Sequence, residues 1–179
     1  MIILMGLAGS GKSTQGKMLA EATGRIWLSA GQVLRDANDP ELKAIMETGK
    51  LVDDMLTVKL MAEKMAEVVR SGRDAILDGF PRDVEQAEWI AENIVEVMEK
   101  VVIIEVPKAE LYQRLALRGR EDDQDQTAIE ERFRIVEQNI YSVCEILAGK
   151  GVEITKIDGT GTPEEVFARL KAVAGVENE

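Results

Sequence analysis

A glycine-rich segment close to Met1 has the residue types and the spacing of a phosphate-binding loop. Gly6, Gly11, Lys12 and Ser13 fit the pattern G-x-x-x-x-G-K-S directly after the apolar run IILM at 2–5. Glycines let backbone N–H groups turn inward around a phosphate, and the positive end of the following helix faces the same anion. Lys12 can bridge the outer phosphates, and Ser13 can ligate Mg²⁺. The segment therefore predicts a site for a nucleoside triphosphate.

Asp78 is the residue that fits best as a second ligand of this magnesium ion. It ends the apolar run AILD at 75–78, where a carboxylate can hold Mg²⁺ through water. We therefore expect Mg²⁺ as the cofactor, with Ser13 and Asp78 as its protein ligands, and no zinc. The chain has no histidine and a single cysteine, Cys144, which excludes Ser-His-Asp hydrolysis and a zinc site built from histidine or several thiolates.

Arginines are numerous for a chain whose net charge is −11. Those that could serve a site are Arg35, Arg82, Arg114, Arg118, Arg120 and Arg132. Phosphoryl transfer between two nucleotides gathers several negative charges, and the planar guanidinium group binds phosphate oxygens in pairs. A phosphate acceptor is already ionised, so positioning and charge compensation suffice without a general base. The acidic balance disfavours long nucleic acid as a partner, and small nucleotides are expected instead.

The order of apolar and amphipathic segments predicts how these residues are brought together. Strands are expected at 2–5, 25–29, 75–78, 101–106 and 152–158, and helices between them include 54–70, 84–99 and 127–151. This alternation is typical of a parallel sheet covered by helices on both faces, where ligands gather at the carboxyl ends of the strands. At those ends lie the phosphate loop, the segments 29–35 and 78–82, and the basic segment after Val106.

Length and composition indicate one domain in a reducing compartment. The chain has 179 residues, which suffices for one hydrophobic core. No apolar run approaches the roughly 20 residues that span a bilayer. The single cysteine cannot form an internal disulfide. We therefore expect a cytoplasmic protein without a membrane partner.

Several segments resemble the adenylate kinases and the related UMP/CMP kinases. GLAGSGKSTQ, LSAGQVLR, GKLVDD, DGFPRDVEQA and RLALRGREDD occur in the order of that family and span nearly the whole chain. The resemblance implies an α/β fold of the P-loop NTPase class, with three αβα layers, five parallel strands, a helical NMP-binding insertion and a short lid. It implies one domain over 1–179, divided into a core (1–29, 60–117, 128–179), an NMP-binding segment (30–59) and a lid (118–127). It also implies a monomer that transfers a phosphoryl group from ATP to AMP.

The resemblance further implies roles for individual residues. Residues that would bind AMP are Ala30, Gly31, Arg35, Val52, Gly79, Arg82 and Gln86. Residues that would bind ATP are Gly9, Ser10, Gly11, Lys12, Ser13, Thr14, Arg114 and Arg118. Residues that would act in catalysis are Lys12, Arg82, Arg118, Arg120 and Arg132. Among them, Gln86 would read the adenine edge of the acceptor, because an amide both donates to and accepts from a purine.

Some residues depart from the adenylate kinase pattern and keep alternatives open. Ala30 stands where adenylate kinases usually have threonine, and the pyrimidine monophosphate kinases have this alanine. Gln86 is adenylate-kinase-like, because UMP/CMP kinases usually place the shorter asparagine there. The longer amide favours AMP, with CMP or UMP as the alternative acceptor. A module that binds ATP without transfer is a further alternative, against which Lys12, Asp78 and the arginines argue.

Overall fold

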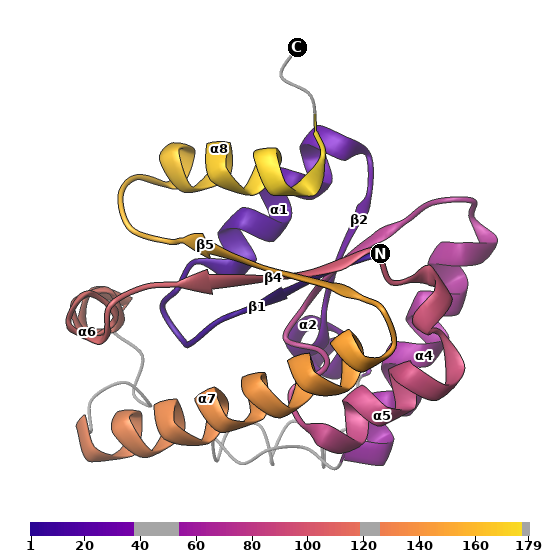
Figure 1. Cartoon of the computed structure of the whole chain (residues 1–179), viewed down its shortest axis with the longest axis horizontal. Helices are drawn as coiled ribbons and strands as arrows, with labels where there is room; N and C mark the ends of the chain where they lie inside the picture. The colour runs from indigo at the N-terminus through magenta and orange to yellow at the C-terminus, as the bar shows by residue number, and fades with distance from the viewer. Residues whose placement is uncertain (38–53, 119–125, 177–179) are drawn as a thin grey trace.

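A five-stranded parallel sheet runs through the centre of the molecule (Figure 1). The computed structural model describes residues 1–37, 54–118 and 126–176. The strands are β1 (Ile2–Met5), β2 (Ile26–Ser29), β3 (Ala75–Asp78), β4 (Lys100–Glu105) and β5 (Glu153–Asp158), in the spatial order β2-β3-β1-β4-β5. Every strand pairing is parallel. All five expected strands are confirmed, each within one residue at either end.

Helices cover both faces of this sheet and complete the three expected layers (Figure 1). The helices are α1 (Lys12–Thr23), α2 (Ala30–Asp36), α4 (Asp54–Arg70), α5 (Val84–Asn93), α6 (Lys108–Arg118), α7 (Gln126–Gly149) and α8 (Pro163–Ala174). Helices α1 and α8 lie on one face, and α4, α5 and α7 lie on the other. Within the described ranges, no helix has both the length and the apolar character needed to cross a bilayer.

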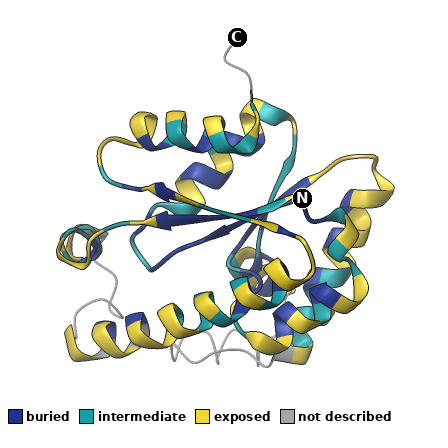
Figure 2. Ribbon diagram, viewed as in Figure 1, coloured by how far each residue is buried: buried dark blue, intermediate teal, exposed yellow. Residues whose placement is uncertain are grey.

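Alternate side chains of β1 enter two different cores. Ile3 and Met5 pack on the face of α4, α5 and α7, whereas Ile2 and Leu4 pack against α1 and α8. Both faces of the sheet are therefore buried, as Figure 2 shows for its central strands. A strand buried on both faces has no polar side to expose, which explains the continuous apolar runs in the sequence. Burial of each large aliphatic side chain contributes about 1.5–3 kcal/mol.

A smaller cluster fixes the phosphate loop against α6 and α7. Leu7 of the loop packs with Leu111 and Leu115 of α6 and with Ile129 and Phe133 of α7. The rings of Tyr112 and Phe133 add a tilted contact, with their centroids 5.6 Å apart. This cluster determines where α6 and the first turns of α7 present their side chains.

The prediction of one helix over 84–99 is wrong for the second half of that range. Helix α5 ends at Asn93, and a short 3₁₀ helix, η1 (Val95–Val97), leads to β4. The side-chain amide of Asn93 donates to the Trp89 carbonyl at 2.8 Å, and Ile94 leaves the helical conformation with φ −145°. A local side-chain hydrogen bond at Asn93, followed by β-branched residues, disfavours continuation of the α-helix.

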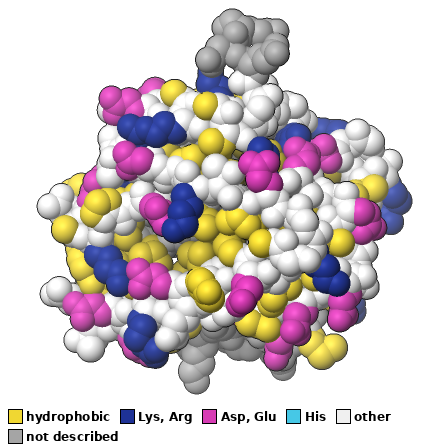
Figure 3. Space-filling model, in the orientation of Figure 1, with side chains coloured by type: hydrophobic (Ala, Val, Ile, Leu, Met, Phe, Trp, Pro, Cys, Tyr) yellow, Lys and Arg dark blue, Asp and Glu magenta, His cyan; other side chains and the backbone are white. Residues whose placement is uncertain are grey.

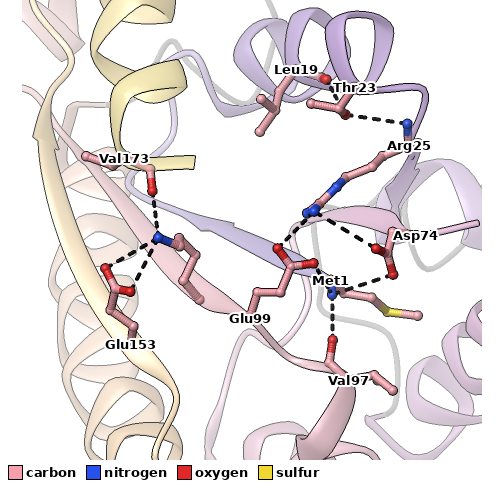
Figure 4. A network of polar contacts seen from close by, with 10 residues as sticks. Met1, Leu19, Thr23, Arg25, Asp74, Val97, Glu99, Glu153 and Val173 are labelled. Atoms are coloured by element: carbon pink, nitrogen blue, oxygen red, sulfur yellow. Dashed lines mark hydrogen bonds and ion pairs between the residues drawn. The ribbon is translucent and has the colours of Figure 1, made fainter. Parts of the chain in front are cut away.

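Charged residues form a network around the amino ends of the strands (Figure 4). Arg25 donates to Glu99 with an Nη2–Oε2 distance of 2.8 Å, and the amino group of Met1 lies 3.2 Å from Glu99 Oε1. Asp74 lies 3.9 Å from both Arg25 Nη2 and the Met1 amino group. Positive and negative groups thus face one another at this end of the sheet.

The expected division into core, NMP-binding segment and lid stays a prediction. Residues 38–53 and 119–125, which make up most of the two expected appendages, lie outside the described residues. Helix α4 runs without a break through the boundary that we expected between residues 59 and 60.

Candidate functional site

The phosphate loop connects β1 to α1, which begins at Lys12. Gly11 precedes the helix with φ 91°, a left-handed conformation that favours glycine. A Cβ atom at Gly6 would lie 2.7 Å from the Ile104 carbonyl oxygen and 2.7 Å from Ser10 Oγ. The first and last glycines of the pattern are therefore required by the backbone itself. Their positions leave the N-terminus of α1 open to an anion.

The Lys12 side chain folds back over this loop. Its Nζ donates to the carbonyl oxygens of Gly6 at 2.8 Å and Leu7 at 3.0 Å. These carbonyls hold the ammonium group beside the N-terminus of α1, where phosphate oxygens would be its stronger, charge-assisted acceptors. The loop and the lysine thus form one cationic group of donors.

Ser13 and Asp78 meet at the carboxyl end of β3. Ser13 Oγ donates to Asp78 Oδ2 at 2.6 Å, and Asp78 is 4% exposed. Asp78 is in register with Leu4 of β1 and with Ser29 of β2, so it lies between the phosphate loop and the start of α2. Hydroxyl and carboxylate oxygens suit Mg²⁺, which keeps most of its ligands as water and phosphate. Within the described ranges, no group of three or more metal-ligating side chains occurs.

Arg82 and Gln86 lie close together after the turn that follows β3. Gly79 follows β3 with φ 74°, and its carbonyl accepts from Arg82 Nε at 2.7 Å. The backbone N–H of Arg82 donates to Gln86 Oε1 at 2.9 Å. Gln86 is 2% exposed, and its own N–H donates to Asp83, the N-cap of α5. The Arg82 N–H therefore helps to fix the orientation of the buried Gln86 side-chain amide.

The local surroundings of Arg82 favour an anion. Loss of hydration among the neighbouring protein atoms lowers the pKa of Arg82, and the charges of Asp78 and Asp83 partly oppose this shift. The side chain is partly exposed, but protein atoms surround the guanidinium closely enough for desolvation to be the main influence on its pKa. An arginine stays protonated under these conditions, so a phosphate beside it would relieve part of the cost of the unpaired charge.

Arg35 lies in the last turn of α2, at the carboxyl side of β2. Its Nη2 donates to Gln32 Oε1 at 2.9 Å, and its guanidinium lies over Gly31, where a Cβ would be 3.4 Å from Nη1. Ala30 is completely buried in the main core. In the described part of the chain, no carboxylate lies within ion-pair distance of Arg35 or Arg82, so both cations have only neutral hydrogen-bond acceptors.

Arg114 joins three elements on the other side of the phosphate loop. Its Nη2 donates to Glu110 Oε1 and, at 2.9 Å, to the Gly159 carbonyl after β5, while Nη1 lies 3.4 Å from the Gly9 carbonyl. A cavity of about 320 Å³ opens beside it, within the range of small-molecule pockets. Its lining includes Gly9, Thr14, Arg114, Gly159, Pro163 and Val166.

The structure brings most of the expected site residues to the carboxyl edge of the sheet. The loop residues and Arg114 lie at the carboxyl ends of β1 and β4, and the acceptor residues follow β2 and β3. Val52 and Arg120 lie outside the described residues. Arg118 ends α6 and Arg132 lies in the second turn of α7, but their side chains are not among those described.

Sequence reasoning missed the carboxyl end of the fifth strand. Glu110, Gly159 and Pro163 line the cavity beside the phosphate loop, as does Gln15, whose Nε2 donates to the Pro163 carbonyl at 2.9 Å. The signal was present in the segment DGTGTP at 158–163, which follows a predicted strand. Because all strands are parallel, this segment had to lie at the same edge as the phosphate loop.

Comparisons with known proteins agree with this geometry. The family model described as "Adenylate kinase" matches residues 4–152. The adenylate kinase of Thermus thermophilus is 36% identical over 188 residues, covering 98% of this chain and 97% of the relative. The adenylate kinases of Prochlorococcus marinus and Deinococcus radiodurans are each 32% identical, and the alignments cover 98% and 95% of this chain and 97% and 94% of the relatives.

Proposed function

This chain belongs to the adenylate kinase family, and on that premise we propose that it transfers the γ-phosphoryl group of ATP to AMP, giving two ADP. The main structural support for this proposal is the arrangement of the phosphate loop and the Arg35 helix around Asp78. The phosphate loop follows β1 on one side of it, and the Arg35 helix follows β2 on the other. Two anion sites thus lie on either side of one buried carboxylate.

We propose that ATP binds on the side of the phosphate loop. Its outer phosphates would lie at the N-terminus of α1, held by the backbone of Gly9–Gly11, by Lys12 and by Thr14. The adenine ring would enter the cavity beside Arg114, which contacts the loop and the segment after β5. Glu110 would hold the guanidinium in place, because its carboxylate already accepts from Arg114.

The acceptor AMP would bind between α2 and the start of α5. Arg35 and Arg82 would grip its phosphate, since each has a guanidinium group without a carboxylate partner in the described chain. Ala30, Gly31, Val52 and Gly79 would line the nucleotide, and Gln86 would contact the base through its side-chain amide. A side-chain amide can both donate to and accept from a purine, and the Arg82 N–H helps to hold this amide in one orientation.

Ser13 and Asp78 would hold Mg²⁺ at the carboxyl end of β3, largely through water. When bound with ATP, the ion supplies positive charge to the β and γ phosphates and stabilises the charge that develops during transfer. Asp78 would act from a buried position between the two sites, so its charge is well placed to orient water molecules on the ion.

Catalysis in this arrangement is positioning and charge compensation. The attacking oxygen belongs to a phosphate that is already ionised at neutral pH, so no residue needs to remove a proton from it. Lys12 and Arg82 would approach the transferring group from the two sites. We propose that Arg118, Arg120 and Arg132 complete this charge from the short lid at 118–127, and that residues 30–59 form the NMP-binding segment. We also propose that the enzyme works as a monomer in the cytoplasm.

A coupled assay with ATP and a panel of monophosphates tests the reaction and its acceptor. We expect AMP to be used far better than CMP, UMP or dCMP. Preferential use of CMP would favour the pyrimidine nucleotide alternative, and ATP binding without any transfer would favour a nucleotide sensor.

Gln86→Ala tests the base contact directly. The variant should raise the KM for AMP and leave the KM for ATP nearly unchanged. Gln138→Ala, an exposed amide on α7, serves as the matched control and should change neither constant. Equal loss for both nucleotides in Gln86→Ala would contradict a role in reading the acceptor base.

A further inference from the structure

A larger cavity lies outside the proposed nucleotide sites, between α7 and the strands β4 and β5. It has a volume of about 760 Å³, more than twice that of the cavity beside Arg114. Figure 3 shows a hollow with a hydrophobic floor on this face of the molecule. The aliphatic side chains of its lining include Leu7, Ile103, Ile104, Ile140, Ile154 and Ile157. Both the size and the lining are those of a site for a small organic molecule.

The charged side chains at the rim of this cavity already have partners. Lys156 Nζ lies 2.8 Å from Glu105 Oε1, and Glu137 accepts from Lys108 at 2.9 Å. Asp158 accepts from the N–H of Thr160 at 2.9 Å and from its hydroxyl at 3.0 Å. A charged ligand would need to disturb one of these pairs or lose its own hydration in an aliphatic surrounding. The rim therefore complements an uncharged molecule.

Cys144 lines the same cavity, and its thiol can be labelled to test whether a molecule enters it. It lies one helical turn after Ile140 on α7, is half-buried, and is the only cysteine of the chain. Burial raises the pKa of the Cys144 thiol, with a smaller opposing effect from Lys156. Only a small fraction of the thiol is therefore ionised at neutral pH, and because the side chain is half-buried in the cavity wall, a reagent that enters the cavity should reach it more easily.

We propose that this cavity binds an uncharged, largely apolar small molecule and that its occupancy changes ATP binding. The cavity ends at Gly6 and Leu7, whose carbonyl oxygens accept the hydrogen bonds of Lys12 Nζ. A molecule packed against these two residues contacts the back of the phosphate loop. The binding itself is independent of the enzyme's reaction, and only the effect on ATP rests on the proposed function.

Alkylthiolation of Cys144 tests the binding. A methanethiosulfonate carrying an uncharged benzyl group is compared with one carrying a trimethylammonium group and one carrying a sulfonate. In each case the thiolate attacks the sulfenyl sulfur, methanesulfinate leaves, a mixed disulfide forms and the thiol proton passes to water. Rates measured by mass on the folded chain are divided by those on the urea-unfolded chain, which removes the intrinsic reactivity of each reagent.

We expect the neutral reagent to be favoured severalfold over both charged reagents in the folded chain. 1-Naphthol should slow labelling, whereas 1-naphthoate should not. Ile140→Trp, which fills the cavity, should abolish the protection by 1-naphthol, and Ile135→Trp, at an exposed position of the same helix, should preserve it. Equal normalised rates for the three reagents, or no protection by 1-naphthol in the wild-type chain, would overturn the site.

The effect of cavity occupancy on ATP binding is measured separately, on the enzyme labelled at Cys144 with the benzyl reagent. Its KM for ATP should rise at least about twofold, while its KM for AMP stays within error. Equal changes in both constants would overturn the coupling. A chain that discriminates between the reagents as expected but transfers no phosphoryl group would contradict the proposed function and leave the binding site standing.

Discussion

Basic side chains at the two ends of the sheet have different kinds of partner. At the amino ends of the strands, Arg25 faces Glu99, and Lys100 lies 3.3 Å from Glu153 (Figure 4). At the carboxyl ends, Arg82 donates to a backbone carbonyl and Arg35 to a side-chain amide. Within the described residues these two arginines have no ion pair, although the chain as a whole carries eleven more acidic than basic residues.

This difference suggests two roles: the paired charges stabilise the fold, and we propose that Arg35 and Arg82 bind a ligand. A partly exposed ion pair contributes up to about 1 kcal/mol and is complete without any further molecule. A cation held only by neutral acceptors gains a stronger, charge-assisted partner when a phosphate arrives. Among the residues that the structure describes, Arg73 also donates only to a carbonyl, so an unpaired arginine indicates an anion site only where other anion-binding groups lie nearby, as the phosphate loop does for Arg35 and Arg82.

The largest effect should come from removing the charge of Lys12. We expect Lys12→Met to lower kcat by about 10²–10³-fold, because one preorganised group that stabilises developing charge is commonly worth that much. The measurement is the steady-state rate with saturating ATP and AMP. Lys17→Met is the matched control, since Lys17 lies on the same helix over the Trp27 ring and should retain activity. Similar losses in both variants would point to damage to α1 instead of loss of a phosphate contact.

Removal of Arg82 should have the next largest effect. We expect Arg82→Ala to lower kcat/KM for AMP by about 10²-fold while folding is preserved, because among the described residues its guanidinium donates only to the Gly79 carbonyl. Arg82→Lys should recover only part of this loss, since an ammonium group cannot bind two phosphate oxygens in a plane.

Arg73→Ala provides the comparison at the other end of the sheet. Arg73 donates to the Gly24 carbonyl at 2.7 Å, far from the proposed nucleotides. This variant should lower stability slightly and leave the KM for AMP unchanged. A rise in that KM as large as in Arg82→Ala would remove the distinction between the two ends.

A smaller effect is expected at Glu110, which pairs with Arg114 on the ATP side. Glu110→Gln keeps the shape of the side chain but removes the charge that holds the guanidinium. We expect the KM for ATP to rise about threefold to fivefold, as the loss of a partly exposed ion pair predicts, with the KM for AMP unchanged. Glu88→Gln, an exposed acid on α5, is the control. An unaltered KM for ATP would show that Arg114 needs no carboxylate to stay in place.

The architecture could be predicted well because it follows from patterns that are local in the sequence. Apolar runs identify β1 to β4 and alternating apolar residues identify β5, while the phosphate loop is encoded by residues that are next to one another in the chain. The register that places Asp78 beside Leu4 and Ser29 follows from the parallel order of the strands. The hydrogen bond between Ser13 and Asp78 is the outcome of that order.

The parts that could not be predicted depend on packing between distant segments. The i,i+4 spacing of Glu110 and Arg114 suits a helical ion pair, but nothing in the residues around them shows that Arg114 will meet the loop after β5, 45 residues further along. The oxygen of Gln86 is engaged by a backbone N–H whose position depends on the turn after β3. The helical pattern through Val97 also continued past Asn93, where a side-chain hydrogen bond ends α5. The contrast between paired and unpaired arginines likewise emerges only in three dimensions.

The smallest effect is expected at Glu99, where it concerns stability and not catalysis. Burial raises the pKa of Glu99, but hydrogen bonds and charge from Arg25 and the Met1 amino group outweigh it, so the pKa lies below its ordinary value of 4.5. A carboxyl with a lowered native pKa contributes stability above its unfolded pKa and loses it as the pH falls through the native pKa. We expect Glu99→Gln to reduce the free energy of unfolding by about 0.5–1 kcal/mol at pH 7, a modest value because the side chain is partly exposed. The difference from wild type should shrink as the pH falls below 4.5, whereas kcat at pH 7 should stay the same. Urea unfolding at several pH values measures the free energy of unfolding, with Glu131→Gln, an exposed acid paired with Arg134, as the control.

A change in kcat without loss of stability would mean that the charges at the amino ends of the strands also serve the reaction.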